Sequence, residues 1–210
     1  MNTNIKCKNC RRAGVKLFLK GDRCYAQKCA MVRRPFAPGK KGKRRTKQLS
    51  EYGRELREKQ NLKIWYNLRE QQFKNYVKAV LAKKGSADNL PLDLMKKLEY
   101  RMDNVVFRMG FATSRIAARQ LVSHNNFLVN GKAVNLPSYQ IGKGDTIAVA
   151  PRKMKNTYFT KLQQTIKNYK APAWVTIDPE KMEGKKVGDV TMEELQPVAE
   201  IGIVFEFYAR

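Results

Sequence analysis

Four cysteines near the start of the chain constrain its fold more than any other feature. Two residues separate Cys7 from Cys10, thirteen residues follow, and four residues separate Cys24 from Cys29. This spacing is typical of two short loops that bring four thiolates to one tetrahedral cation. The lysines and arginines beside these cysteines favour the deprotonated form that binds metal. The sequence therefore predicts a structural metal site, with zinc as its occupant.

Three other interpretations of the cysteines compete with zinc. Four unrelated buried thiols are disfavoured, because such thiols would not be paired by spacing. An iron–sulfur cluster takes the same four cysteine ligands and stays open as an alternative. Two disulfides are disfavoured, because the first residues, MNTNIKCKNC, lack the apolar core of a secretory signal peptide. No apolar run approaches the ~18 residues of a membrane span. We therefore expect an intracellular protein that is neither secreted nor embedded in a membrane.

Positive charge dominates the chain and is concentrated at its beginning. The formal net charge is +25, from 43 lysines and arginines against 18 acids. Residues 1–50 contain sixteen of these bases and one acid, Asp22, whereas residues 176–210 carry eight acids and four bases. Like charge at this density repels itself unless an anionic partner neutralises it. A nucleic acid is the simplest such partner.

The densest basic segment lies between Pro35 and Lys47. Its prolines and glycines exclude a helix, and its bases suit a run of phosphates. We expect this segment to lie along RNA or DNA rather than to be a solvated loop. The bases concerned are Lys40, Lys41, Lys43, Arg44, Arg45 and Lys47.

Hydrophobic periodicity predicts helices in the middle of the chain. Ser50 is a suitable N-cap for a helix over 51–60, and apolar residues recur at helical spacing over 73–81. A further stripe over 98–109 ends at Gly110, a candidate left-handed cap. We interpret these stripes as core.

A compact α/β module follows these helices. Thr113 or Ser114 can cap a helix over 115–123. A β-hairpin over 127–134 has Asn-Gly at its turn, where both central residues need positive φ, and a strand follows over 146–149. We therefore expect two short helices packed on a small twisted sheet.

The last ten residues are expected to be buried on one face. Ile201, Ile203, Phe205 and Phe207 alternate with other residues, a pattern that indicates a buried face. We expect this segment to pack against the helical region and not to be a free tail.

Over essentially its whole length the chain resembles the bacterial-type family of the small-subunit ribosomal protein S4. CKNCRRAGVKLFLKGDRCYAQKCAMVRRP resembles the metal-binding start of that family, and SEYGRELREKQ with YNLREQQFKNY resembles its helical domain. RMDNVVFRMGFATSRIAARQLVSHNNFLVNGKAVNLPSY resembles its RNA-binding module. The resemblance implies an α+β protein with a metal knuckle on a mainly helical domain. An RNA-binding module of two helices on a small twisted antiparallel sheet is embedded in it.

The same resemblance implies a function, partners and a location. The family binds the 5′ domain of small-subunit ribosomal RNA, nucleates assembly of the subunit and supports decoding fidelity. Its neighbours are ribosomal protein S5 and messenger RNA, near the channel through which the messenger enters. We therefore expect a protein of the cytoplasmic ribosome, with an organellar ribosome left open, that is not a homo-oligomer and contacts no membrane.

Carried over residue by residue, the family's RNA face has contributions from two regions. Arg33, Arg34 and the bases of 40–47 would contribute from the first region. The module would contribute Ser114, Arg115, Arg119, Gln120, Ser123, His124 and Lys132. Arg115 and Arg119 are expected to reach phosphates, with the alternative that Arg119 pairs with an acid such as Asp103.

Three departures from the family pattern bear on these expectations. Where the family commonly has Pro-Gly-Gln-His-Gly, residues 38–42 read Pro-Gly-Lys-Lys-Gly, which favours phosphate contacts over base or sugar contacts. After His124 the family usually has glycine, but here Asn125 and Asn126 follow, and Asn tolerates the left-handed backbone. Residues 151–188 show little family-specific pattern.

Together these features predict three regions. Residues 1–47 form the metal knuckle and basic extension, and residues 48–97 form a helical domain completed by the C-terminal segment 199–210. Residues 98–198 form the RNA-binding module and the α+β region after it.

Two rival functions belong to other classes. An RNA-modifying enzyme would need a second, larger domain with a catalytic carboxylate, for which the chain has no room. The single histidine, His124, also has no carboxylate pair or phosphate-cradling loop beside it. A metal-knuckle DNA regulator would be expected to dimerise and to prefer duplex DNA. We therefore expect an RNA-binding protein that is not an enzyme.

Overall fold

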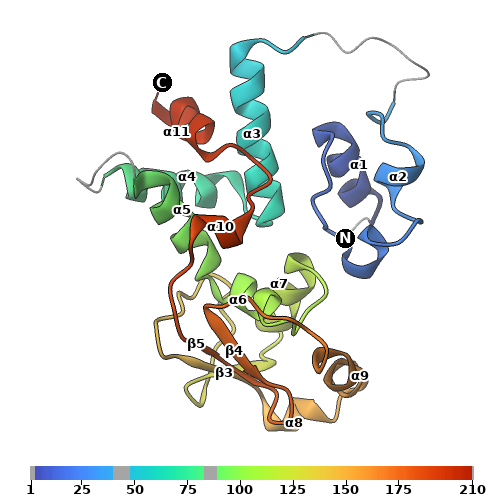
Figure 1. The fold of residues 1–210 in the computed structure, drawn as a ribbon, viewed down its shortest axis with the longest axis vertical. Coiled ribbons are helices and arrows are strands. Elements are labelled where there is room, and N and C mark those ends of the chain that lie inside the picture. The colour runs from blue at the N-terminus through green and yellow to red at the C-terminus, as the bar shows by residue number, and fades with distance from the viewer. Residues whose placement is uncertain (1–2, 40–47, 83–88, 210) are drawn as a thin grey trace. The chain divides into compact units, whose positions relative to one another are not determined.

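The chain divides into two compact units in the computed structural model, which describes residues 3–39, 48–82 and 89–209 (Figure 1). Unit 1 comprises Met1–Leu94 and Gln196–Arg210, and unit 2 comprises Met95–Leu195. Both ends of the chain therefore belong to the same unit. Within the described residues, no helix is long and apolar enough to cross a membrane.

Unit 1 begins with a small segment, residues 3–34, which we call the cysteine module. It contains helix α1 (Thr3–Ala13), the short 3-10 helix η1 (Gly21–Cys24) and helix α2 (Ala30–Arg33), and α1 packs on α2. Its buried apolar residues are few, chiefly Ala13, Leu17 and Leu19 beside the cysteines. Outside the module, Arg57 donates a hydrogen bond to the carbonyl of Ala13.

Two longer helices form the body of unit 1. Helix α3 (Glu51–Trp65) begins where the sequence predicts, because the Ser50 hydroxyl accepts a hydrogen bond from the Gly53 N–H at 3.2 Å. It continues beyond the predicted end at Gln60. Helix α4 (Glu70–Leu81) buries Phe73, Val77 and Val80 on the predicted face. The predicted helical stripe over 73–81 is thus confirmed.

The end of the chain is a helix, α11 (Ile201–Ala209), and its buried face is not made by the alternating residues. Ile201 and Val204, three apart, are its buried residues, whereas Phe205 and Phe207 are half-buried. The helix packs against α3 and α4. Apolar residues are so dense here that alternation is present by chance, and the neighbouring helices select the conformation.

The stripe over 98–109 does not form one helix. Helix α5 (Leu90–Glu99) ends before Arg101, which is extended and forms an isolated antiparallel bridge with Gln140, and α6 (Met102–Arg108) starts afresh. The boundary between the units falls within α5. Gly110 follows with φ 73°, so the predicted left-handed cap is confirmed.

The predicted helix and hairpin of unit 2 are both confirmed. Helix α7 (Arg115–Ser123) starts at Ser114, whose hydroxyl accepts a hydrogen bond from the Ala117 N–H at 3.2 Å. Strands β1 (Phe127–Val129) and β2 (Lys132–Ala133) flank an Asn-Gly turn with φ of 49° and 79°. Strand β3 (Thr146–Val149) pairs with β1.

The sheet of unit 2 is larger than the sequence predicts. Residues 151–188 supply helices α8 (Pro151–Met154) and α9 (Thr157–Ile166), and then strands β4 (Val175–Asp178) and β5 (Glu183–Lys186). The result is a five-stranded antiparallel sheet in the order β2-β1-β3-β5-β4. A last helix, α10 (Met192–Leu195), closes the unit. The broad prediction, helices with a small antiparallel sheet, is confirmed.

Candidate nucleic-acid interface

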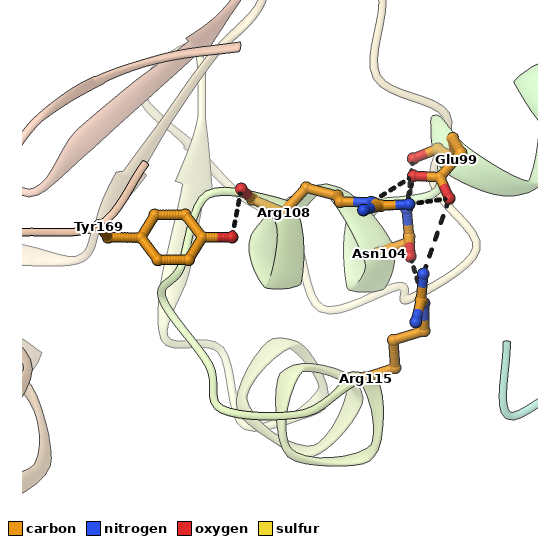
Figure 2. A network of polar contacts seen from close by, with 5 residues as sticks. All are labelled: Glu99, Asn104, Arg108, Arg115 and Tyr169. Atoms are coloured by element: carbon orange, nitrogen blue, oxygen red, sulfur yellow. Dashed lines mark hydrogen bonds and ion pairs between the residues drawn. The ribbon is translucent and has the colours of Figure 1, made fainter. Parts of the chain in front are cut away.

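A buried polar network fixes the start of α7, the helix expected to contact RNA (Figure 2). Its centre is the Glu99 carboxylate, which is fully buried. Arg108 donates to both carboxylate oxygens, from Nε at 2.8 Å and from Nη2 at 2.9 Å, and Asn104 Nδ2 donates at 2.6 Å. Arg115 completes the network with an ion pair to Glu99 at 3.7 Å. Residues from α5, α6 and α7 are therefore held together by one carboxylate.

Arg115 forms its contacts inside the protein, contrary to its predicted place on the RNA face. Its side chain is 8% exposed, its Nε donates to Asn104 Oδ1 at 2.7 Å, and its guanidinium lies 4.7 Å from the centroid of the Phe107 ring. Withdrawing this guanidinium toward a phosphate would break both its hydrogen bond to Asn104 and its ion pair with the buried Glu99 carboxylate. The geometry thus favours a structural role for Arg115. Ser114 is likewise buried and serves as the cap of α7.

Arg119 lies near a second internal ion pair. Arg101 donates to both oxygens of Asp103, at 3.1 and 2.7 Å, and both residues are buried. Burial raises the pKa of Asp103, whereas the charges of Arg101 and Arg119 act in the opposite direction. Arg119 is half-buried, and its charge acts on the Asp103 carboxylate, as the alternative interpretation of Arg119 expects.

The other predicted module residues are exposed. Gln120, Ser123 and His124 lie three and four positions apart at the end of α7, so they share one face of the helix; we call them the α7 stripe. Their side chains can donate to phosphates, and can both donate to and accept from ribose hydroxyls and base edges. Lys132 is exposed on the hairpin that follows, beside the Asn-Gly turn. Unit 2 thus offers a polar stripe and a separate cation to a ligand.

The bases predicted in the first region are only partly described. Arg33 and Arg34 are exposed at the end of α2. The predicted contacts of Lys40, Lys41, Lys43, Arg44, Arg45 and Lys47 lie outside the described residues.

The four cysteines are gathered in the cysteine module, and none forms a disulfide. Cys7 and Cys10 lie one turn apart on α1, Cys24 ends η1, and Cys29 precedes α2. Burial raises the pKa of Cys10, a hydrogen bond donated by the Leu17 N–H lowers it, and the Cys24, Cys7 and Cys29 thiols raise it further. Cys24 accepts a hydrogen bond from the Lys20 N–H at 3.4 Å. Neighbouring thiols with backbone donors are a donor set that suits zinc or an iron–sulfur cluster.

The thiols do not close around a common centre. Over residues 3–39, 48–82 and 89–209, no three His, Cys, Asp or Glu side chains are arranged so that they could hold a metal ion. The chemistry of the four residues therefore fits the predicted metal, whereas the positions of their sulfur atoms do not yet form its coordination shell.

Two residues of unit 2 that sequence reasoning missed position the site. Glu99 is one of the two acids within the apolar stripe over 98–109, a pattern that could have indicated buried partners for arginine. Tyr169 comes from the segment without recognisable pattern, and its hydroxyl donates to the carbonyl of Arg108 at 3.2 Å (Figure 2). A Cβ at Gly110 would lie 2.7 Å from the Tyr169 ring, so the glycine is needed both for its backbone and for this contact.

Comparisons with known proteins agree with this arrangement of two units. A family described as ribosomal protein S4/S9 N-terminal domain matches residues 1–99, and the S4 domain matches residues 101–147. The small ribosomal subunit protein uS4 of Syntrophus aciditrophicus is 47% identical over 204 residues, 97% of this chain and 96% of the relative. That of Solidesulfovibrio magneticus is 44% identical over 99% and 98% of the two chains, and that of Thermus thermophilus is 45% identical over 97% and 96%. Agreement that spans both successive domains shows that the chain belongs to the family of the bacterial small-subunit ribosomal protein S4.

Proposed function

We propose that this protein binds the 5′ domain of small-subunit ribosomal RNA, nucleates assembly of the subunit and supports decoding fidelity. Its family is one of structural ribosomal proteins and not of enzymes, which agrees with the prediction that no reaction is catalysed. The family also indicates its location, the ribosome of the cytoplasm. RNA binding is the part of this function on which the other parts depend.

One observation carries the proposal: the exposed α7 stripe is followed by an exposed cation on the hairpin, in a chain with a net charge of +25. Gln120, Ser123 and His124 supply hydrogen bonds to the RNA, and Lys132 supplies a phosphate contact. Arg33, Arg34 and the basic run of 40–47 add phosphate contacts from the first region. Arg115 acts indirectly, by fixing the start of the helix that carries the stripe.

We propose further that Cys7, Cys10, Cys24 and Cys29 hold a structural zinc ion. Bound zinc would cross-link a segment whose apolar residues are too few to fold it alone. An iron–sulfur cluster is the alternative for the same ligands. Elemental analysis of the purified protein separates the two: one zinc per chain supports the proposal, and stoichiometric iron with sulfide supports the alternative.

The proposed neighbours are ribosomal protein S5 and messenger RNA near its point of entry to the subunit, and we propose that the chain does not form homo-oligomers. Family resemblance is the support for these three statements. Assembly of the protein on small-subunit RNA, with and without S5, tests the first of them. Cooperative binding of the two proteins is expected, and independent binding would contradict it.

Filter binding tests RNA binding, the part of the proposed function on which the other parts depend. At equal salt, the metal-loaded protein should bind a folded 5′-domain transcript more tightly than duplex DNA of similar length. Chemical footprinting on naked small-subunit RNA should then show protection within the 5′ domain. Preference for duplex DNA would support the DNA-regulator alternative, and protection confined to other RNA domains would overturn the proposed site. Replacing exposed Glu193 with glutamine provides a control that should change neither result.

A further inference from the structure

An unusual backbone conformation turns Phe18 away from the core of the cysteine module. Phe18 has φ 49°, in the left-handed region, which is unfavourable for a bulky residue that is not glycine. Its neighbours Leu17 and Leu19 are 1% and 4% exposed, whereas the Phe18 side chain is half-buried. The two leucines thus fill the small core while the aromatic ring between them is left at the surface. Strain of this kind persists only where the surrounding structure enforces it, and it is concentrated at functional sites.

The ring of Tyr25 lies against Phe18 at this surface. Their centroids are 5.1 Å apart and their planes are inclined by 32°. Tyr25 is 73% exposed, the highest value among the large apolar and aromatic side chains of the described residues. One exposed tyrosine is ordinary in a soluble protein. Two neighbouring rings, one displayed by a strained backbone, form a larger exposed aromatic surface, which we call the aromatic platform (Phe18 and Tyr25).

The cysteine module holds both rings of the platform. Tyr25 directly follows Cys24, and its N–H donates to the carbonyl of Asp22 at 3.1 Å. Cys24 in turn accepts the hydrogen bond from the Lys20 N–H, two residues after Phe18. The two rings are therefore linked through η1 and one thiol, so the platform is formed before any ligand arrives.

The charge around the platform indicates the chemistry of its ligand. The sixteenth to twenty-eighth residues include Lys16, Lys20, Arg23 and Lys28 but a single acid, Asp22. Arg23 and Lys28 are exposed. An aromatic surface among cations suits an unpaired nucleobase, because the ring stacks on the base while the cations attract the adjoining phosphates. An apolar protein surface would gain nothing from these charges.

Phe36, another exposed aromatic residue of unit 1, does not offer the same surface. The Arg11 guanidinium lies 5.3 Å from the centroid of its ring, and Arg11 Nε donates to the Phe36 carbonyl at 2.9 Å. One face of Phe36 is therefore already occupied by a cation.

We propose that the aromatic platform stacks on an unpaired base of the RNA that the protein binds. This inference rests on the proposed function, because it assigns a contact within the same RNA complex. It adds a stacking contact, made by the cysteine module, to the polar and ionic contacts of unit 2 and the basic run.

Binding of the full-length, metal-loaded protein to a 5′-domain transcript tests the proposal. Loss of one stacked base weakens affinity about 5- to 150-fold, which is the expected effect of Tyr25→Ala. Tyr25→Phe should bind as the unaltered protein does, because it retains the ring, and so should Gln27→Ala, an exposed substitution in the same module. The dependence of affinity on salt should be unchanged in Tyr25→Ala, whereas Arg23→Ala should reduce the slope by about one unit.

Chemical probing of bases in the same complexes locates the contact. In Tyr25→Ala, one or two unpaired bases should lose protection while the rest of the footprint is unchanged. An unaltered footprint and affinity would overturn the platform and leave RNA binding by the chain intact. Failure of the unaltered protein to prefer the transcript would instead overturn the proposed function. Elemental analysis and hydrogen exchange of Tyr25→Ala test whether the weaker binding comes from unfolding of the module. A binding defect seen only when other subunit proteins are present would also contradict the proposal.

Discussion

The cysteine module and unit 2 obtain a defined fold by different means. The module buries three cysteines with a few apolar residues such as Leu17 and Leu19. Unit 2 buries a continuous aromatic and aliphatic core, in which the Phe127 ring lies 5.9 Å from Phe111 and 6.1 Å from Phe159. Segments of fewer than ~40 residues seldom fold on an apolar core alone. The difference teaches that close packing stabilises unit 2, whereas in the cysteine module the proposed zinc site would compensate for scarce apolar residues.

The two regions also place their positive charge differently. Arg33 and Arg34 of the cysteine module are exposed, whereas Arg101 and Arg115 of unit 2 are buried in ion pairs. The number of bases in a region therefore does not give the number of its phosphate contacts. The cysteine module and unit 2 can therefore serve as internal references for each other when one of them is perturbed.

The largest effect is expected from loss of the thiol ligands. Cys24→Ser should unfold the cysteine module while unit 2 stays folded, because the proposed structural zinc would contribute about 10 kcal/mol or more to such a segment. Hydrogen exchange should show lost protection over residues 3–34 alone. Gln27→Ala, an exposed substitution between the same cysteines, should leave protection unchanged. Unaltered exchange after removal of all metal would contradict the difference between the two regions.

A large effect in unit 2 is expected from Glu99→Gln. Loss of this buried charge leaves Arg108 and Arg115 without their carboxylate and should destabilise unit 2 by about 3–5 kcal/mol. Urea denaturation followed by hydrogen exchange should show the loss in unit 2 and not in the cysteine module. Glu193→Gln, on an exposed side chain, provides the reference. Equal stability of the two variants would refute the role assigned to the network.

A smaller effect is expected at Gly110. Gly110→Ala requires an alanine at φ 73°, which costs roughly 1–2 kcal/mol, and its Cβ would also displace the Tyr169 ring. In a background with Tyr169→Ala, only the backbone cost should remain. Melting curves of the two single variants and the double variant measure this coupling, and strictly additive effects would show that the ring does not restrict Gly110.

The smallest effect concerns pH and the helices of unit 1. Burial would raise the pKa of Glu70, but hydrogen bonds from Lys59 at 2.6 Å and Lys63 at 2.8 Å lower it from 4.5 to about 2. The ionised carboxylate therefore stabilises the fold above pH 4.5, and this contribution is lost as pH falls toward 2. Glu70 is 46% exposed, so solvent screening limits the contribution to below ~1 kcal/mol. Glu70→Gln should reduce, by this amount, the loss in free energy of unfolding between pH 4.5 and pH 2. An unchanged loss over this pH range would contradict the pairing of Glu70 with the two lysines.

Local signals in the sequence predicted local structure well. Ser50 and Ser114 cap their helices and Asn130-Gly131 forms the hairpin turn, because each depends on residues within a few positions along the chain. Strands β4 and β5 escaped prediction because their segment has weak alternation and pairs with β3 from elsewhere in the chain. The role of Arg115 escaped for a similar reason, since Glu99 and Asn104 lie eleven or more positions away.

The central claim is that RNA contacts the α7 stripe and Lys132 of unit 2, which are exposed, and not the buried arginines of that unit. Affinity for the 5′-domain transcript, measured between 50 and 200 mM salt, tests this claim with Lys132→Ala and Arg115→Ala. Each lost phosphate contact should lower the slope of log affinity against log salt by about one unit. Lys132→Ala should therefore reduce the slope and keep the melting temperature, whereas Arg115→Ala should lower the melting temperature and keep the slope. A reduced slope for Arg115→Ala with an unchanged slope for Lys132→Ala would contradict the claim.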